Sequence, residues 1–182
     1  MRKIILATIF IVSIMTENAN SQTQTFTLKS SDIGGQATVT EEFDGFGCTG
    51  KNISPKLSWV NPPVGTKSFA VTMYDPDAPT GSGWWHWLVF DIPANVHQLD
   101  RNFGAQPEKA AFGIQSNTDY GKPGYGGPCP PKGHGLHQYM ITVYALNTEK
   151  LGLDAKTNAA VVGFNINAHT IGKASLVMYY SR

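Results

Sequence analysis

Residues 84–92 read WWHWLVFDI, a run that is apolar on both faces apart from His86 and the terminal Asp91. Side chains alternate between the two faces of a strand, and a run without alternating polarity is typical of a central strand covered on both sides. The alternation places His86 on the same face as Leu88 and Phe90. The sequence therefore predicts a buried strand that carries one imidazole. A lone histidine in such a place is more often structural than functional, unless another motif supplies a partner for it.

Further strand-like runs lie on both sides of this stretch, separated by turn residues. Only the C-terminal third favours helix, in KTNAAVVGF (156–164) and INAHTIG (166–172), with Asp154 or Thr157 as the capping candidate. The pattern predicts an all-β chain with long loops. The predicted strands are QTFTLKS (24–30), QATVTEEF (36–43), KLSWV (56–60), SFAVTMYD (68–75), HQYMITVYAL (137–146) and ASLVMYYS (174–181).

The N-terminus has the pattern of a secretory signal peptide. Arg2 and Lys3 precede an apolar run, residues 4–15, that is too short to span a bilayer as a helix. Small residues at 19–21 predict cleavage before Gln22. We therefore expect residues 1–21 to be removed, residues 22–182 to form a single domain without a membrane span, and the protein to be periplasmic or secreted.

The predicted mature chain carries no excess of either charge. Removing Arg2, Lys3 and Glu17 from the totals of 14 basic and 13 acidic residues leaves 12 of each. A nucleic-acid-binding protein usually shows a basic patch or stripe, so we do not expect a nucleic acid as partner. All 19 glycines and all 11 prolines lie in residues 22–182, which favours strands and ordered loops over helices.

Two acidic residues follow a predicted strand in YDPDAP (74–79). Pro76 and Pro79 prevent the strand from continuing, so the carboxylates of Asp75 and Asp77 have fixed directions. Aspartates in loops commonly accept hydrogen bonds from nearby backbone amides. That interpretation is favoured for Asp77. Asp75 adjoins the apolar end of the strand and is the better candidate for a functional role.

The stretch GGPCPPKGHGLHQY (126–139) predicts one wall of an anion-binding pocket. Its prolines stiffen the loop, and its glycines allow close approach and leave backbone amides that can point at an anion. His137 and Tyr139 then enter a strand on one face, and both side chains can donate hydrogen bonds to phosphate oxygens. His134, in flexible surroundings, is interpreted as exposed and incidental.

The chain has two cysteines, Cys48 and Cys129, each in a glycine-rich loop. In an oxidising compartment such a pair favours a disulfide. Two free thiols whose Cα atoms lie too far apart to be bridged are an equally good interpretation. The sequence leaves both open.

These motifs, in this order, resemble the phosphatidylethanolamine-binding protein family in its bacterial, Raf-kinase-inhibitor-like branch. The resemblance rests on DPDAP (75–79), the Trp-His strand start, GPCPPKGHGLHQYMITVYAL (127–146) and FGCTGKNISPKLSW (46–59), and it runs from about Phe26 to Tyr180. It implies a Greek-key β-sandwich of a large and a small antiparallel sheet with a few short helices. It also implies a cis bond between Ala78 and Pro79, and no long C-terminal helix over the pocket.

The resemblance also implies a ligand pocket with Gly127–Pro131 as its rim. Of the tryptophans at positions 84, 85 and 87, at most one is expected to line the pocket. Asn52 and Pro55 are expected to brace it, and His97 and His169 are interpreted as surface or local structural residues. The candidate ligand-binding residues are Asp75, Asp77, His86, Gly127, Cys129, Pro131, His137 and Tyr139.

The expected function is binding of a small anion, a phosphate or phosphomonoester such as a phospholipid head group, without catalysis, metal or cofactor. Backbone amides and donors from His86, His137 and Tyr139 are expected to hold the oxygens of this ligand. Because histidine gains charge in mild acid, tighter binding is predicted there. A hydrolase that uses a metal or the His and Asp side chains is one alternative, with Cys129 as the only plausible nucleophile. An inhibitor of a protease or kinase is another. A homodimer stays open.

Overall fold

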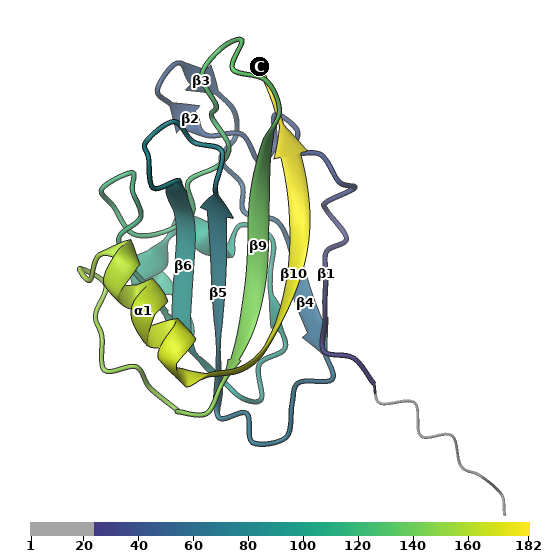
Figure 1. Ribbon diagram of the computed structural model, residues 1–182, viewed down its shortest axis with the longest axis vertical. Coiled ribbons are helices and arrows are strands. Elements are labelled where there is room, and N and C mark those ends of the chain that lie inside the picture. The colour runs from purple at the N-terminus through teal and green to yellow at the C-terminus, as the bar shows by residue number, and fades with distance from the viewer. Residues whose placement is uncertain (1–23) are drawn as a thin grey trace, which may run out of the picture.

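The long alternating runs form the centre of a five-stranded sheet (Figure 1). The structure, a computed structural model, describes residues 24–182, so the signal-peptide prediction for residues 1–21 lies outside the described residues. The strand order is β10-β9-β5-β6-β8, and every neighbouring pair is antiparallel. The strands are β5 (Ser68–Asp75), β6 (Trp84–Pro93), β8 (Ile114–Gln115), β9 (His137–Leu146) and β10 (Thr170–Tyr180).

A smaller three-stranded antiparallel sheet packs against the large one. It has the order β1-β4-β7, and a separate pair, β2 with β3, forms a short hairpin. The mainly antiparallel all-β prediction is confirmed. The strands are β1 (Thr27–Lys29), β4 (Leu57–Val60), β7 (Gln98–Leu99), β2 (Asp44–Gly45) and β3 (Cys48–Thr49).

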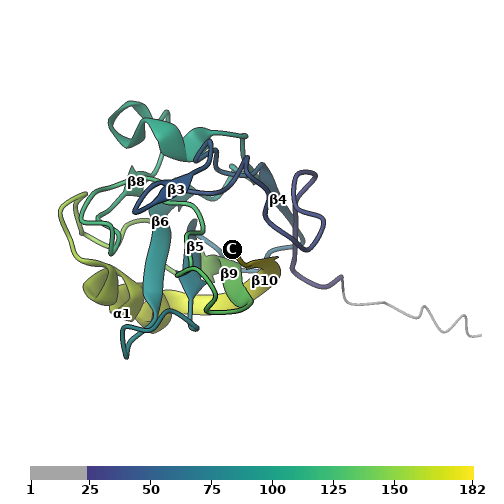
Figure 2. The same ribbon diagram turned by 90° about the horizontal axis from the view of Figure 1, so that it is seen from above.

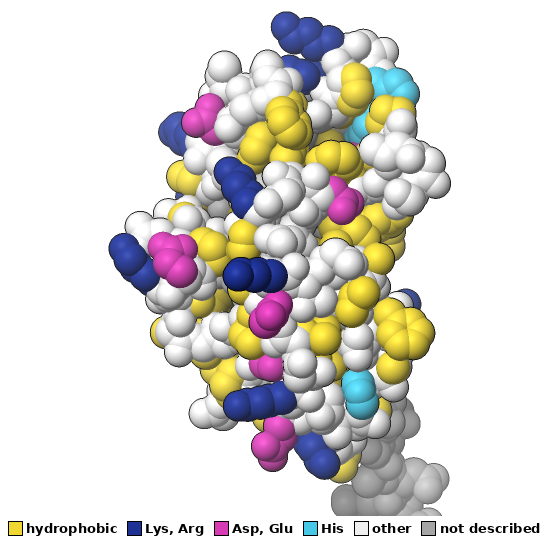
Figure 3. All heavy atoms as spheres, turned by 90° about the vertical axis from the view of Figure 1, so that its left-hand side faces the viewer, with side chains coloured by type: hydrophobic (Ala, Val, Ile, Leu, Met, Phe, Trp, Pro, Cys, Tyr) yellow, Lys and Arg dark blue, Asp and Glu magenta, His cyan; other side chains and the backbone are white. Residues whose placement is uncertain are grey.

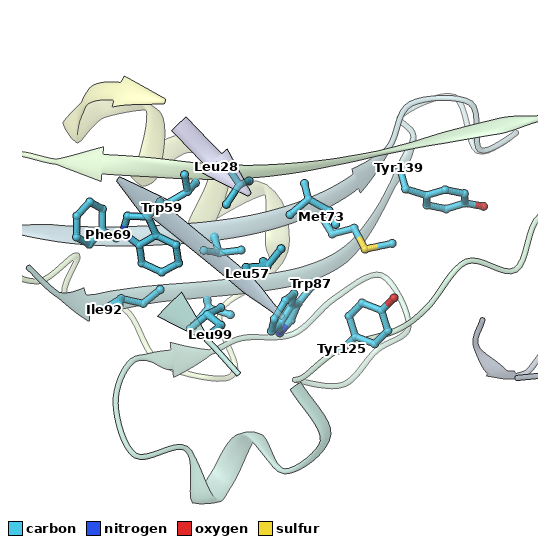
Figure 4. Packing of buried hydrophobic residues seen from close by; sticks show 14 of the residues in the cluster. Leu28, Leu57, Trp59, Phe69, Met73, Trp87, Ile92, Leu99, Tyr125 and Tyr139 are labelled. Carbon is cyan, nitrogen blue, oxygen red and sulfur yellow. The ribbon is translucent and has the colours of Figure 1, made fainter. Parts of the chain in front are cut away.

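The main hydrophobic core lies between the two sheets. Trp59 and Leu57 from β4 meet Phe69 and Met73 from β5, and all four side chains are buried (Figure 4). Burying such side chains is the largest favourable contribution to folding, at roughly 1.5–3 kcal/mol for each. Tyr139 lies at one end of this cluster, with its hydroxyl directed away from the other labelled side chains.

Helix α1 (Ala159–His169) covers the other face of the large sheet (Figure 2). Val162 and Ile166 of the helix pack against Leu88 and Phe90 of β6. Because β6 is covered on both faces, its sequence shows no alternation of polarity, as predicted for a central strand. Two 3₁₀ turns, η1 (Phe103–Ala105) and η2 (Pro107–Lys109), lie in the loop before β8.

The prediction of two short helices in the C-terminal third is wrong. One helix ends at His169, and residues 170–172, predicted as helical, begin strand β10. The N-cap is Asn158, whose side chain accepts a hydrogen bond from the Val161 amide at 3.0 Å. Asp154, a predicted cap, instead holds the preceding turn by accepting from the Lys156 amide at 2.9 Å.

The predicted strand at 36–43 is also wrong, because its side chains bond their own backbone. The Glu41 carboxylate accepts from both the amide and the hydroxyl of Thr38, each at 2.8 Å, and folds the segment into a turn. Such local bonds compete with strand pairing. Four two-residue strands, β2, β3, β7 and β8, were not predicted.

Candidate ligand-binding site

The antiparallel register brings the separate sequence motifs together at one end of the large sheet. Asp75 is the last residue of β5, whereas His86 lies near the start of β6 and His137 begins β9. The carboxyl end of β5 therefore lies beside the amino ends of both neighbours, and Asp75 pairs in register with Trp84. The hairpin β2–β3 and the loop before β9 extend beyond this end, at the top of Figure 1.

A cavity of about 210 Å³ opens at this point. Its wall contains side chains from three strands of the large sheet, from the β2–β3 hairpin and from the loop that precedes β9. Six of the eight candidate ligand-binding residues line it, and no residue of α1 does. The lining residues are Phe46, Asp75, Ala78, Pro79, Thr80, Trp84, His86, Tyr120, Cys129, Pro130, Pro131, His137 and Tyr139.

Counted residue by residue, six of the eight candidates line the cavity, and Asp77 and Gly127 lie outside its wall. The Asp77 carboxylate accepts from the Gln138 amide at 2.8 Å and so ties the turn after β5 to the start of β9. Asp77 is thus a turn residue, the interpretation that the sequence favoured for it. The six lining candidates are Asp75, His86, Cys129, Pro131, His137 and Tyr139.

Asp75 and His137 form a buried pair in the wall of the cavity. The Nδ1–H of His137 donates to a carboxylate oxygen of Asp75 at 2.8 Å, and the two residues are 2% and 3% exposed. The other oxygen of Asp75 accepts from the Asp77 amide at 2.8 Å. A carboxylate only accepts when it is ionised, so this pair fixes the tautomer and the orientation of the His137 ring.

His86 is held by the loop that forms the rim. Its Nδ1–H donates to the Gly126 carbonyl at 2.8 Å and lies 3.2 Å from the Gly127 carbonyl. Because carbonyl oxygens cannot donate, Nε2 of the neutral ring carries a lone pair and is an acceptor. Burial lowers the pKa of His86 to about 4, although the Gly126 bond and the Asp75 charge act in the opposite direction. The prediction that His86 donates to a phosphate oxygen is therefore wrong, because its proton is already in use.

Two hydrogen-bond donors of the cavity wall have no partner among residues 24–182. They are the hydroxyl of Tyr139 and the indole N–H of Trp84, and both atoms are buried. Burial, and then the nearby Asp75 charge, raise the pKa of the Tyr139 phenol, so the hydroxyl keeps its proton. A buried donor without a partner costs about 1–3 kcal/mol, and a ligand that accepts from it recovers that cost.

Tyr120 is the main site residue that the sequence analysis missed. Its ring stacks on Phe43 with ring centroids 4.1 Å apart. The centroid of the Tyr120 ring also lies 5.5 Å from that of Phe46 and 5.4 Å from those of Trp84 and His86. Its hydroxyl donates to the Gly127 carbonyl at 2.9 Å. No signal in the sequence identified it, because Tyr120 comes from a loop whose position depends on tertiary contacts.

A disulfide and an arginine join the two sides of the rim. Cys48 and Cys129 are bonded, with Cα atoms 6.0 Å apart, which decides between the two interpretations of the cysteines. The guanidinium of Arg182 donates to the carbonyls of Pro130 at 2.6 Å and Gly47 at 2.7 Å. The hairpin loop and the loop before β9 are therefore linked both covalently and by hydrogen bonds.

The glycine amides of the rim do not point at a ligand, contrary to the prediction. The Gly126 amide donates to the His86 carbonyl at 2.9 Å, and the Gly127 amide donates to the Asn52 side chain at 2.8 Å. A Cβ on Gly127 would lie 1.8 Å from the Glu41 carbonyl oxygen, so this glycine permits close packing of backbone on backbone. Asn52 braces the rim as predicted.

Two further expectations about the site are wrong. Residues 24–182 contain no cis peptide bond, so the implied cis bond before Pro79 is absent. The trans form is the ordinary preference of X–Pro bonds. His134 is exposed but not incidental, because its Nδ1 lies 2.8 Å from Nε2 of His137.

The remaining histidines and tryptophans agree with their predicted structural roles. His97 bonds the Ala94 carbonyl at 3.1 Å, and His169 bonds the Asn147 side chain at 3.1 Å. Trp87 lies in the core, where its N–H donates to Gln115 at 2.7 Å. Trp85 packs against Tyr74 with ring centroids 4.7 Å apart. Trp84 is the tryptophan that lines the cavity.

The cavity wall contains one carboxylate, that of Asp75, and the described lining contains no Lys or Arg. Within residues 24–182, no three His, Cys, Asp or Glu side chains are placed to hold a metal ion. On the face of the molecule that carries α1, Lys and Arg lie scattered among Asp and Glu (Figure 3). Among the described residues, no helix has the length and apolar character needed to cross a membrane.

Comparison with protein families matches residues 29–181 to the phosphatidylethanolamine-binding proteins. Among curated proteins, Escherichia coli YbcL is 47% identical over 165 residues, which cover 88% of this chain and 90% of that protein. E. coli YbhB is 49% identical over 140 residues, which cover 76% and 88%. Both belong to a group designated UPF0098.

Solved structures give the same result. A crystal structure of E. coli YbcL, described as a new member of the mammalian PEBP family, matches with a TM-score of 0.84 at 46% identity and covers 86% of this chain and 98% of that one. A homologue from Chlamydia trachomatis matches with a TM-score of 0.71 at 26% identity and covers 86% and 97%.

Proposed function

The chain belongs to the phosphatidylethanolamine-binding protein family, and we propose that it is an exported protein that binds a small phosphate-like ligand in the cavity without catalysis. The observation that carries this proposal is the pair of unpartnered donors, Tyr139 Oη–H and Trp84 Nε1–H, in the cavity wall. Acid oxygens are acceptors that suit these donors. The cavity therefore offers two donors to an oxyanion, although none of the described lining residues is a Lys or Arg.

The acceptors of the wall restrict the form of that ligand. Asp75 is negative when ionised, and Nε2 of His86 presents a lone pair. A fully deprotonated phosphate would be repelled by Asp75. A singly protonated phosphate or phosphomonoester offers a P–O–H donor to these acceptors and oxygens to the two donors. We infer that the cavity selects the singly protonated form.

This selection changes the cause of the predicted preference for mild acid. His86 has a pKa of about 4 and stays neutral from pH 5 to 8, so it does not gain charge there. A phosphomonoester, whose second pKa is about 6, gains its proton in this range. Tighter binding in mild acid is therefore still expected, with the ligand as the group that titrates.

Binding rather than catalysis is supported by the state of Cys129. It was the only plausible nucleophile, and its sulfur is bonded to Cys48. The thiolate is the nucleophilic form of cysteine, and a disulfide has none. The same disulfide supports export, because such bonds persist in oxidising compartments and are rare in the cytosol.

Isothermal titration calorimetry of the mature chain with phosphate and sulfate tests the proposal. The two ions have similar size and shape, but sulfate carries no proton near neutral pH. We expect saturable binding of phosphate at one site, and binding of sulfate at least about ten-fold weaker because it lacks the charge-assisted bond to Asp75. Equal affinity for both ions, or no binding of phosphate or phenyl phosphate, would refute the proposal.

A second set of measurements distinguishes a free ligand from a lipid head group. Vesicles that contain phosphatidic acid, whose head group is a phosphomonoester, are compared with vesicles of phosphatidylcholine, whose head group is a phosphodiester without an ionisable proton. Co-sedimentation with the first vesicles alone would indicate a lipid source. Binding of phenyl phosphate without binding to either vesicle would indicate a free ligand.

A further inference from the structure

His137 has no ring nitrogen free for a ligand in this structure. Nδ1 is bonded to Asp75, and Nε2 lies 2.8 Å from Nδ1 of His134. His137 nevertheless lines the cavity and is 2% exposed. The imidazole that the sequence identified as a ligand-binding group is therefore already hydrogen-bonded to a residue of the loop that precedes β9.

The positions of the protons make this occupation complete. Because Nδ1 of His137 donates to Asp75, Nε2 of the neutral ring accepts the Nδ1–H of His134. If His137 is doubly protonated, Nε2 donates to His134 instead. In both cases Nε2 has a partner, and a guest in the cavity can use this nitrogen only after His134 has left it.

His134 is placed so that its ring can leave. Its side chain is exposed, and its neighbours Gly133 and Gly135 have φ angles of 75° and 96°, with open space where a Cβ would stand. The backbone is held by bonds from the His134 amide to the Pro131 carbonyl and from the Gly133 amide to the Arg182 carbonyl. Rotation of the side chain alone, which takes picoseconds to nanoseconds at exposed positions, would release His137.

We propose that His134 is a displaceable stopper, an internal competitor that the ligand must remove from Nε2 of His137. This inference rests on the proposed function, because it concerns a ligand of the same cavity. The ligand's acid oxygen or P–O–H group replaces His134 at Nε2. Ligands too small or too badly placed to reach Nε2 leave the stopper in position, so His134 contributes to specificity.

The stopper has a consequence for affinity that is opposite to that of a binding residue. Removing a side chain that contacts a ligand weakens binding, whereas removing a competitor strengthens it. His134→Ala should bind phosphate about five-fold more tightly, the value of one ordinary hydrogen bond. Leu136→Ala is a matched control, because Leu136 is an exposed residue of the same loop, 57% accessible, with no polar side-chain atom.

The experiment combines calorimetry with NMR of the mature chain labelled with ¹⁵N in its histidines. The hydrogen bond between His134 and His137 should give a scalar coupling between the two nitrogens. We expect this coupling in the free protein, its loss when inorganic phosphate saturates the site, and tighter phosphate binding by His134→Ala but not by Leu136→Ala.

The possible failures are distinguishable. Persistence of the coupling in the phosphate-saturated protein, or equal or weaker binding by His134→Ala, would overturn the stopper and leave the proposed function standing. Absence of phosphate binding in both the wild type and His134→Ala would overturn both the stopper and the proposed function. In that case the cavity would fail to bind phosphate even without the competing His134 side chain.

Discussion

The carboxylate of Asp75 accepts a 2.8 Å hydrogen bond from His137, although 62 residues separate the two in the chain. The pair exists because β5 ends where β9 begins, so two motifs become neighbours through strand pairing. The same carboxylate is the only charge in the described cavity lining. Its removal is therefore the most direct test of how the cavity chooses its ligand.

Asp75→Asn should reduce the preference for phosphate over sulfate about ten-fold, because an amide lacks the charge that discriminates between them. Calorimetry with both ions measures this preference. Asp77→Asn is the matched control, since Asp77 lies outside the lining and bonds the Gln138 amide. An unchanged preference in Asp75→Asn would show that Asp75 does not contact the ligand.

Tyr139→Phe should separate stability from binding. In the free protein the hydroxyl has no partner among residues 24–182, so its removal should leave the free energy of unfolding unchanged or raise it by about 1 kcal/mol. Phosphate affinity should fall about five- to ten-fold, because the ligand loses a donor. Chemical denaturation and calorimetry measure the two quantities.

Tyr125→Phe provides the contrast for this prediction. Its hydroxyl donates to the Glu41 carbonyl at 3.2 Å and does not line the cavity. The variant should lose about 1 kcal/mol of stability and keep its phosphate affinity. If both tyrosine variants lost stability equally, Tyr139 would be a structural residue.

The buried, neutral His86 should lower the free energy of unfolding as the pH falls. Its pKa is about 4 in the folded protein and near 6.5 in the unfolded chain, so between these values the unfolded chain binds a proton that the fold excludes. The contribution is fully present above pH 6.5 and falls by about 1.4 kcal/mol for each pH unit down to pH 4, roughly 3 kcal/mol in all.

Urea denaturation across this range checks the prediction when the wild type is compared with His86→Gln. Glutamine can still donate to the Gly126 carbonyl but does not titrate. The variant should show a shallower decline of stability below pH 6.5, and its stability relative to the wild type should therefore increase in acid. Parallel pH curves for the two proteins would contradict the assignment.

Arg182 should position the rim rather than only supply charge. One guanidinium donates to the carbonyls of Pro130 and Gly47, on opposite sides of the mouth. Arg182→Ala should weaken phosphate binding about three- to ten-fold, and Arg182→Lys should restore little of it, because an ammonium group is a point charge without the planar fork. Full recovery in the lysine variant would show that charge alone matters.

The sequence predicted the long central strands well and the short ones badly. The predictions for 68–75 and 137–146 agree with β5 and β9 residue for residue, and 84–92 falls one residue short of β6. In these strands the order of apolar and polar residues along the sequence indicates which side chains are buried. The two-residue strands have too few side chains for a pattern, and their pairing is decided by what lies across from them.

Site residues at strand ends were predictable for the same reason. Asp75, His86, His137 and Tyr139 line the cavity as expected because strand pairing places them. The prediction that His86 shares a face with Leu88 and Phe90 is wrong, because an irregularity in the pairing of β6 at this residue separates it from the face that packs against α1. Tyr120 and Phe46 come from loops, and local sequence does not specify where a loop lies in three dimensions. The direction of each proton could not be predicted either, and it reversed the expected role of His86 from donor to acceptor.

The disulfide between Cys48 and Cys129 means that the mouth of the cavity is completed at a definite stage in the life of the protein. Thiols stay reduced in the cytosol and are joined in oxidising compartments. In a chain exported as proposed, the hairpin and the loop before β9 would be joined by the disulfide only in the oxidising compartment. The cavity would then reach its disulfide-linked, ligand-binding form only after export, in the compartment where it meets its ligand.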